Sequence, residues 1–178
     1  LHATADIGAR KVDTAAARVR ALNPDVSVEP VHARLDDESA AALLEGVDVV
    51  VDCTDTFEAR YALNDASLRR GTPVVHASIF RYEGRLTVLA PRRGPCYRCI
   101  YPVQPPADVA PACDIAGVLG AVPGVIGALQ ATEALKLLLG VGSPLVGRML
   151  LWDALTAQFD EIAVARDPRC AACGTPAL

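Results

Sequence analysis

Four of the six cysteines form two CxxC pairs, Cys96 with Cys99 and Cys170 with Cys173. Two such pairs supply four thiolates, the ligand set that Zn²⁺ prefers in structural sites, and the glycine or proline beside each pair suits the sharp turn that this requires. Because all four ligand positions are then filled, the zinc is expected to be structural and not catalytic. Two disulfides or a redox CxxC are the alternatives, and a cytosolic setting disfavours stable disulfides.

The two remaining cysteines lie in different settings. Cys53 falls in an apolar, β-branched run, which indicates inert packing in a strand. Cys113 follows a stretch with four prolines, residues 101–112, which predicts an exposed loop, and a lone thiol on such a loop is a candidate nucleophile. A surface cysteine without function is the alternative, because spacing alone assigns it no histidine partner.

Asp55 is a third candidate, because it directly follows the strand pattern of residues 47–53 and precedes a helix pattern over about 57–70. Ligands of parallel α/β sheets bind at the carboxyl ends of strands, and an acid there suits Mg²⁺, which phosphoryl and nucleotidyl transfer require. The simpler alternative is that Asp55 or Thr56 caps the following helix, and the two roles are compatible.

An alternating series of helices and strands must position these residues. Apolar periodicity predicts helices over 8–22, 39–44, 57–70 and 123–139. The last of these is expected to be largely buried, with a narrow polar stripe that includes Gln130, Glu133 and Lys136. β-branched or alternating runs predict strands over 26–28, 47–53, 72–77, 85–89, 148–153 and 158–164. This alternation predicts a parallel α/β sheet.

Composition excludes several classes of protein. The chain has 178 residues, the size of one domain, and 52% hydrophobic with 21% charged residues exclude a disordered chain. A net charge of −4 and 4% aromatic residues argue against nucleic-acid binding. No signal peptide is recognisable, and the longest uncharged apolar run, 115–129, is too short to span a bilayer, so a soluble intracellular protein without a membrane partner is expected.

Several segments, taken in order, resemble the ThiF/MoeB/HesA family of ubiquitin-activating-enzyme-like adenylyltransferases. They are Leu1–His2 with Ile7–Val12, Asp52–Asp55, Arg60 with Asn64, Gly84–Val88, Pro95–Cys99, Cys113–Gly120, Gly124–Lys136 and the final CxxC. Each segment alone is weak, but together they are highly specific and extend over essentially the whole chain.

The resemblance implies an α/β fold with a Rossmann-like, mostly parallel sheet, flanking helices, antiparallel C-terminal strands and a structural zinc on the four CxxC thiolates. It also implies a cytoplasmic, homodimeric adenylyltransferase that uses ATP and Mg²⁺. The expected partner is a ubiquitin-like sulfur-carrier protein with a C-terminal Gly-Gly. Its carboxylate attacks the α-phosphate, giving an acyl-adenylate and pyrophosphate, and sulfur is then delivered to the activated carboxyl group.

The same resemblance assigns roles by position in the motifs. Lys11 resembles the lysine that contacts the ATP phosphates, and Asp55 resembles the acid that organises Mg²⁺. Thr56 stands where the family often has an asparagine beside the nucleotide. Cys113 matches the loop cysteine that some members link to the carrier as a thioester or persulfide. Arg60 is expected to be a solvated charge.

The resemblance further implies that residues 1–178 are a single ThiF-type domain lacking its N-terminal nucleotide-binding part, since the family's Gly-rich loop precedes the first matching segment. No GxGxxG occurs in the chain, and the chain alone is expected not to adenylate. The main alternative is a catalytically incomplete, zinc-stapled module that dimerises or docks a carrier. A zinc-containing, nucleotide-linked oxidoreductase is disfavoured, because four thiolates close the metal and no dinucleotide fingerprint is present.

Overall fold

The structure is a computed structural model that describes residues 2–105 and 117–174. The chain divides into two compact units, Leu1–Arg34 and Leu35–Leu178, and each is described by itself. The predicted loop nucleophile, Cys113, lies outside the described residues.

The first unit contains a short 3₁₀ turn, η1 (Thr4–Asp6), and helix α1 (Lys11–Leu22). The helix begins at Lys11 and not at residue 8 as predicted. Gly8 has a left-handed backbone conformation, with φ of 88°, which is incompatible with a right-handed helix at that residue. The predicted strand over 26–28 does not form. The Arg20 guanidinium donates to the Val28 carbonyl at 2.6 Å, so a side chain satisfies a group that a strand partner would otherwise bond.

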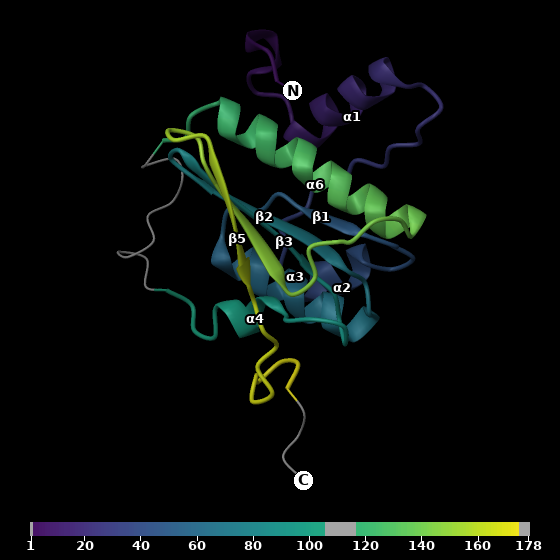
Figure 1. The fold of residues 1–178 in the computed structure, drawn as a ribbon. Helices are drawn as coiled ribbons and strands as arrows, with labels where there is room; N and C mark the ends of the chain where they lie inside the picture. The colour runs from purple at the N-terminus through teal and green to yellow at the C-terminus, as the bar shows by residue number, and fades with distance from the viewer. Residues whose placement is uncertain (1, 106–116, 175–178) are drawn as a thin grey trace. The chain divides into compact units, whose positions relative to one another are not determined.

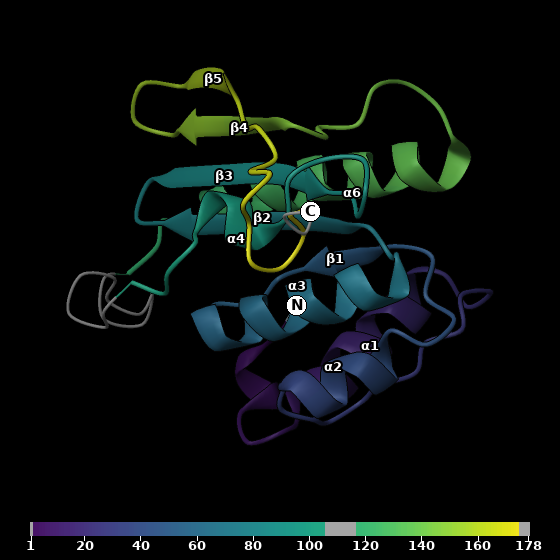
Figure 2. The same ribbon diagram turned by 90° about the horizontal axis from the view of Figure 1, so that it is seen from below.

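A five-stranded sheet forms the centre of the second unit. The strands are β1 (Val50–Asp52), β2 (Val74–Phe80), β3 (Glu83–Leu89), β4 (Arg148–Asp153) and β5 (Gln158–Ala163). They lie side by side in chain order (Figure 2). The predicted α/β class and antiparallel C-terminal strands are confirmed.

The direction of the strands differs from the prediction of a mostly parallel sheet. In the part of the chain that the structure describes, β1 and β2 are parallel, and the other three neighbouring pairs are antiparallel. The reason lies in the connections, because tight turns join β2 to β3 and β4 to β5, and such turns can join only antiparallel strands. A crossover helix, α3 (Phe57–Arg70), separates β1 from β2 and allows them to run parallel.

Helices cover both faces of the sheet (Figure 1). Helix α6 (Ala121–Leu139) packs against β1, β2 and β3 on one face. The other face carries α3, α2 (Asp37–Leu43) and α4 (Tyr97–Ile100). Because successive strand residues point to opposite faces, Val74 belongs to the core beneath α3 and Val75 to the core beneath α6.

Glycine at position 84 allows α6 to lie close to β3. A Cβ atom added at Gly84 would lie 2.3 Å from Cγ1 of Ile126, which is itself only 2% exposed on α6. Real Cβ atoms do not approach other carbon atoms so closely. The close contact of helix and sheet therefore depends on the missing side chain, and it sets the distance of the rest of α6 from the strands.

Helix α6 turns its polar stripe towards the interior. Gln130 and Glu133 are each 5% exposed, whereas Leu135, Leu138 and Leu139 are more than half exposed. The prediction of a largely buried helix is therefore wrong, and the polar stripe is the side that packs on the sheet. By length and composition α6 is the one helix of the described residues that meets the criterion for crossing a membrane, a criterion that core helices of soluble proteins also meet.

Candidate functional site

The four CxxC cysteines come together as predicted, with their sulfur atoms all within 4.8 Å of one another. The Sγ of Cys96 lies 3.6 Å from that of Cys170, and the Sγ of Cys99 lies 3.4 Å from that of Cys173. A tetrahedral Zn²⁺ with Zn–S bonds of about 2.3 Å holds its sulfurs about 3.8 Å apart, whereas a disulfide bond is only about 2.05 Å long. The spacing therefore fits a four-thiolate metal site and excludes two disulfides in this arrangement.

Local backbone structure aims the sulfurs at one point. The Cys99 N–H donates to the Cys96 carbonyl at 3.0 Å, which closes the turn of the first pair. In the second pair, the Gly174 N–H donates to the Cys170 carbonyl at 2.8 Å, and a Cβ at Gly174 would lie 2.5 Å from that oxygen. The Asp167 N–H also donates to the Cys99 sulfur at 3.4 Å, a contact of the kind that orients metal ligands.

The thiols of this cluster differ in how readily they ionise. Burial raises the pKa of Cys96. Burial acts in the same direction on Cys170, but the backbone N–H groups of Cys173 and Ala172 and the neighbouring sulfurs outweigh it and lower its pKa to about 7. Because thiolates and not thiols bind zinc, Cys170 is the ligand best prepared for a metal at neutral pH.

The second candidate region follows the carboxyl end of β1. Asp55 and Thr56 are both exposed there, in the loop that leads into α3. The Thr56 hydroxyl accepts the Ala59 N–H at 3.3 Å, so Thr56 caps the helix, as the simpler alternative proposed. The Asp55 side chain has no ion pair or hydrogen bond with residues 2–105 or 117–174, which leaves both carboxylate oxygens available to a ligand.

A buried polar pair lies directly behind this loop. Asp52 and His76 are register partners on β1 and β2, each 3% exposed, and the His76 Nδ1 lies 2.6 Å from the Asp52 Oδ2. The other oxygen of Asp52 accepts two hydrogen bonds from Thr54, one from the backbone N–H at 2.9 Å and one from the hydroxyl at 2.7 Å. This pair could not be predicted from the sequence, because only the strand register brings the two residues together.

Two further side chains hold the same loop from neighbouring helices. The Gln130 amide on α6 donates to the carbonyls of Asp52 at 2.9 Å and Val75 at 3.1 Å, which joins the ends of β1 and β2. The Arg60 guanidinium on α3 donates to the Thr54 carbonyl at 2.8 Å. Arg60 is half-buried, so the expectation of a solvated charge is wrong, and its role is to hold the loop.

The position of β1 corrects the prediction that Cys53 is inert packing in a strand. In the described sheet β1 is an edge strand, and Val51 on it is 44% exposed. Cys53 is also exposed, with its sulfur 3.9 Å from the Gln130 Oε1, so it does not lie within a packed core. Apolar β-branched runs occur in central and edge strands alike, and the pattern alone did not separate the two cases.

The end of β1 carries a fixed negative charge. Burial alone would raise the pKa of Asp52, but the hydrogen bond and charge of His76 and the bonds from Thr54 outweigh it and hold that pKa below its ordinary value. Burial, and then the charge of Asp52, raise the pKa of Cys53. An ionised carboxylate thus stands behind the loop that carries the exposed Asp55.

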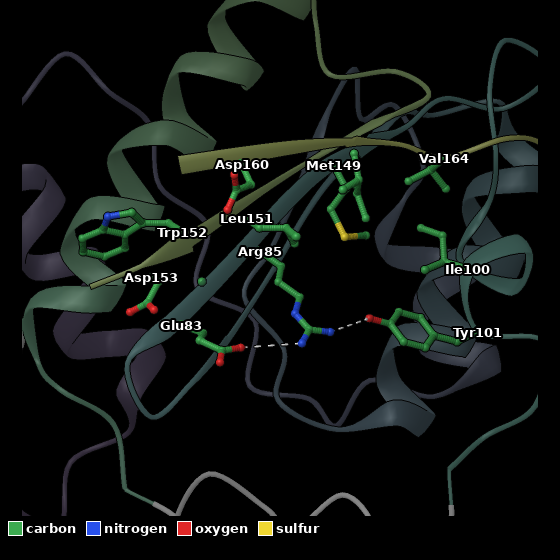
Figure 3. Close-up of a pocket in the computed structure, with 12 residues that line it drawn as sticks. Glu83, Arg85, Ile100, Tyr101, Met149, Leu151, Trp152, Asp153, Asp160 and Val164 are labelled. Carbon is green, nitrogen blue, oxygen red and sulfur yellow. Dashed lines mark hydrogen bonds and ion pairs between the residues drawn. The ribbon is translucent and has the colours of Figure 1, made fainter. Parts of the chain in front are cut away.

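A groove of about 460 Å³ lies over β3, β4 and β5 on the side that carries α4 (Figure 3). Its apolar residues include Ile100, Met149, Leu151, Ile162 and Val164, and its polar residues are Glu83, Arg85, Tyr101, Asp153 and Asp160. The Arg85 guanidinium lies between the Glu83 carboxylate, at 3.7 Å, and the Tyr101 hydroxyl, at 3.5 Å (Figure 3). No sequence motif indicated this groove. The available signal was that both faces of β4 are apolar.

Tyr101 connects this groove to the Asp55 loop. Its backbone carbonyl accepts the Tyr61 hydroxyl of α3 at 2.8 Å. Its ring packs edge-on against Phe57, with centroids 6.3 Å apart, and Phe57 is the first residue of α3, directly after Thr56. Tyr101 therefore links one wall of the groove to the first residue of α3.

Lys11, the predicted phosphate contact, belongs to the first unit. It is exposed and is the first residue of α1, and its neighbour Arg10 at the N-cap makes no capping hydrogen bond through its side chain. The N–H groups of the first turn lack such a cap, and two cations stand at the positive end of the helix dipole. A helix start of this kind favours an anion such as a phosphate.

Several proteins of known sequence are similar to this chain over nearly its whole length. The SAMP-activating enzyme E1 of Haloferax volcanii is 48% identical over 174 residues, which cover 98% of this chain and 64% of the relative. The sulfur carrier protein adenylyltransferase of Thermus thermophilus is 46% identical, and the match covers 98% of this chain and 66% of the relative. The adenylyltransferase and sulfurtransferase MOCS3 of Bos taurus is 47% identical, and the match covers 98% of this chain and 38% of the relative. The chain thus spans less than two thirds of the length of these relatives.

Solved structures of similar fold agree with this match. A structure of E. coli MccB superposes with a TM-score of 0.82 at 18% sequence identity, covering 98% of this chain and 55% of that one. At that identity the likeness establishes the fold alone. The ThiF family matches residues 1–172 of the sequence, which include the Asp55 loop and three of the four cluster cysteines. The chain therefore belongs to the ThiF family.

Proposed function

We propose that residues 1–178 belong to one ThiF-type domain of an ATP-dependent adenylyltransferase. Its substrate would be the C-terminal glycine of a ubiquitin-like sulfur-carrier protein. Relatives named as a sulfur carrier protein adenylyltransferase and a SAMP-activating enzyme E1 support this activity. The observation that carries the proposal is the exposed carboxylate of Asp55 at the carboxyl end of β1, which has no partner among the described residues.

In the proposed reaction the carboxylate of the carrier attacks the α-phosphate of ATP, so that a carboxyl–phosphate bond forms and pyrophosphate leaves. Asp55 would hold Mg²⁺, which neutralises phosphate charge when bound. Thr56 and Lys11 are the proposed nucleotide contacts, with the lysine cation stabilising the negative charge that develops during transfer. Cys113 is proposed to attack the acyl-adenylate in the step that follows, so that a thioester to the carrier forms and AMP leaves.

The groove over β3 to β5 supports docking of a protein partner. An apolar floor within a charged rim is typical of protein interfaces, and Tyr101 joins the groove to the start of α3. We place the carrier in this groove, with its C-terminal tail directed towards Asp55. The exposed leucines at positions 135, 138 and 139 of α6 support a second apolar interface, and we propose a homodimer.

The four-thiolate cluster is proposed to hold a structural Zn²⁺. The sulfur spacing and the hydrogen-bonded turns at Cys96 and Cys170 support a closed tetrahedral site with no position left for a substrate. A closed site of this type contributes to folding and takes no direct chemical part in the reaction. Because the groove and the α6 leucines are both proposed to contact proteins, we propose that the enzyme is soluble and cytoplasmic.

The test is ATP–pyrophosphate exchange by the full-length protein that contains this chain, with a carrier ending in Gly-Gly. Asp55→Asn keeps the shape of the side chain and removes its charge, so exchange is expected to fall by about 100-fold or more. Asp48→Asn changes another exposed acid, just before β1, and is expected to leave exchange unchanged. A carrier without its two terminal glycines is expected to support no exchange.

The zinc-stapled docking module makes the opposite prediction. Such a module would bind the carrier but catalyse no exchange, and Asp55→Asn would not alter carrier affinity. Carrier binding without exchange by the wild-type protein would therefore exclude the adenylyltransferase and identify the module.

A further inference from the structure

We propose that Asp52 and His76 are positioning residues for Asp55, because the buried pair fixes the turn that presents the Asp55 carboxylate. The activity part of this inference rests on the proposed function. The structural part concerns the backbone at Thr54 and Asp55, and it can be measured without any activity.

The hydrogen bonds of Asp52 define the turn. Its Oδ1 accepts both the backbone N–H and the hydroxyl of Thr54, at 2.9 and 2.7 Å, and its Oδ2 accepts from His76 at 2.6 Å. A side chain that bonds the backbone two residues further on forms an Asx-type turn, which bends the chain out of the strand. Asp55 is the next residue, so the orientation of Thr54 determines where the Asp55 side chain points.

Stability alone does not account for a buried polar pair at this position. The Asp52 and His76 side chains are 2% and 4% exposed, and burying such groups costs free energy that well-packed apolar residues of similar size would avoid. What apolar residues cannot do is accept three hydrogen bonds from two directions. The carboxylate at position 52 meets that requirement, and the imidazole holds the carboxylate in place.

The same turn is held from three helices. Gln130 of α6 bonds the Asp52 carbonyl, and Arg60 of α3 bonds the Thr54 carbonyl. The ring of Tyr97, on α4, packs edge-on against the His76 ring with centroids 5.0 Å apart. Backbone groups on both sides of the turn are thus fixed, while the Asp55 carboxylate remains exposed. A fixed backbone with a free side chain is what a preorganised ligand site requires.

The test combines exchange kinetics and amide hydrogen exchange on the full-length protein. Asp52→Ala removes both acceptor oxygens, and Thr54→Val removes only the hydroxyl, which keeps the test valid where the alanine variant fails to fold. Asp52→Asn is the conservative variant, since its amide oxygen still accepts from Thr54. Thr156→Val is the matched control, because this residue lies in the exposed turn between β4 and β5.

We expect Asp52→Ala to lower kcat by about 10- to 100-fold and Thr54→Val by a smaller factor, with the KM for the carrier unchanged. Asp52→Asn is expected to keep kcat within about threefold of wild type, and Thr156→Val to have no effect. In the same variants, NMR is expected to show amide exchange at Thr54 and Asp55 about tenfold faster in Asp52→Ala and unchanged in Asp52→Asn.

Two results would overturn the positioning role. One is amide exchange at Thr54 and Asp55 that is unchanged in Asp52→Ala, or in Thr54→Val where the alanine variant does not fold. The other is loss of kcat in Asp52→Asn as large as in Asp52→Ala, which would assign the effect to charge and not to geometry. A wild-type protein without exchange activity would refute the proposed function alone, and the amide rates would then decide the positioning role.

Discussion

Removing the metal from the four-thiolate cluster is expected to lower the free energy of unfolding by about 4 kcal/mol. The cluster ties Cys96 and Cys99 to Cys170 and Cys173 and so closes a loop of about 70 residues. The loop-closure expression for a cross-link gives about 4.4 kcal/mol at 25 °C for a loop of this length. At about 2–4 °C per kcal/mol for a protein of this size, the Tm is expected to fall by about 8–16 °C.

The measurement is thermal unfolding of the zinc-loaded protein before and after chelation, with the zinc content per chain determined in each sample. Cys170→Ser removes one ligand and is expected to reproduce the effect of chelation. Cys53→Ser changes a thiol outside the cluster and is expected to leave the Tm and the zinc content unchanged. Because zinc binds thiolates, the affinity is expected to decrease as the pH falls.

A fully demetallated protein with an unchanged Tm would refute this reasoning, since packing alone would then hold the two pairs together. Gly174→Ala provides a second check that leaves every ligand in place. Its Cβ would lie 2.5 Å from the Cys170 carbonyl oxygen, so the second turn must open and the zinc affinity is expected to decrease. Wild-type zinc affinity in this variant would show that the turn relaxes without moving its sulfurs.

Two further predictions concern packing and charge. Gly84→Ala places a Cβ 2.3 Å from Ile126 and is expected to lower the free energy of unfolding in urea by about 1–3 kcal/mol. Gly124→Ala meets open space around its Cβ and is expected to raise that free energy by up to about 1 kcal/mol. Equal effects of the two substitutions would contradict the close packing of α6 on β3. The pKa of Asp52 is lower in the folded protein than its unfolded value of about 3.9, so this carboxylate contributes stability above that pH and loses it as the pH falls through the folded pKa. In Asp52→Asn the free energy of unfolding in urea is therefore expected to fall less steeply than in the wild type as the pH drops below about 4. Asp48→Asn is the control and is expected to follow the wild type. A pH dependence in Asp52→Asn equal to that of the wild type would contradict this prediction.

Features encoded within short segments could be predicted from the sequence. The two CxxC pairs specify their own turns and their ligand atoms, and the structure brings the four sulfurs together. The location of Asp55 in the loop between a strand and a helix could also be predicted, because Asp55 directly follows an apolar run and precedes a helix pattern. The order strand, loop, helix places such a residue at one edge of a sheet. In both cases residue type and local spacing carry the information, without knowledge of the tertiary structure.

Features that depend on long-range contacts could not be predicted. Alternating helices and strands favoured a parallel sheet, but strand direction depends on which strands pair, and short turns reversed it. The polar stripe of α6 was correctly located, but the helix is not largely buried, because Gln130 and Glu133 find partners in the interior and the leucines opposite them are exposed. The Asp52–His76 pair spans two strands and exists only through their register.

The two candidate sites are connected through the residue that follows Cys96. The Tyr97 N–H donates to the Asn64 Oδ1 on α3 at 2.8 Å, and the Tyr97 ring packs against His76. The first metal turn is thereby joined to the helix that follows Asp55 and to the pair behind it. A structural zinc at this position would bear on the candidate acid only through the packing of Tyr97 and His76, and not through its own chemistry. The closed metal site is therefore compatible with a part in preorganising the reaction.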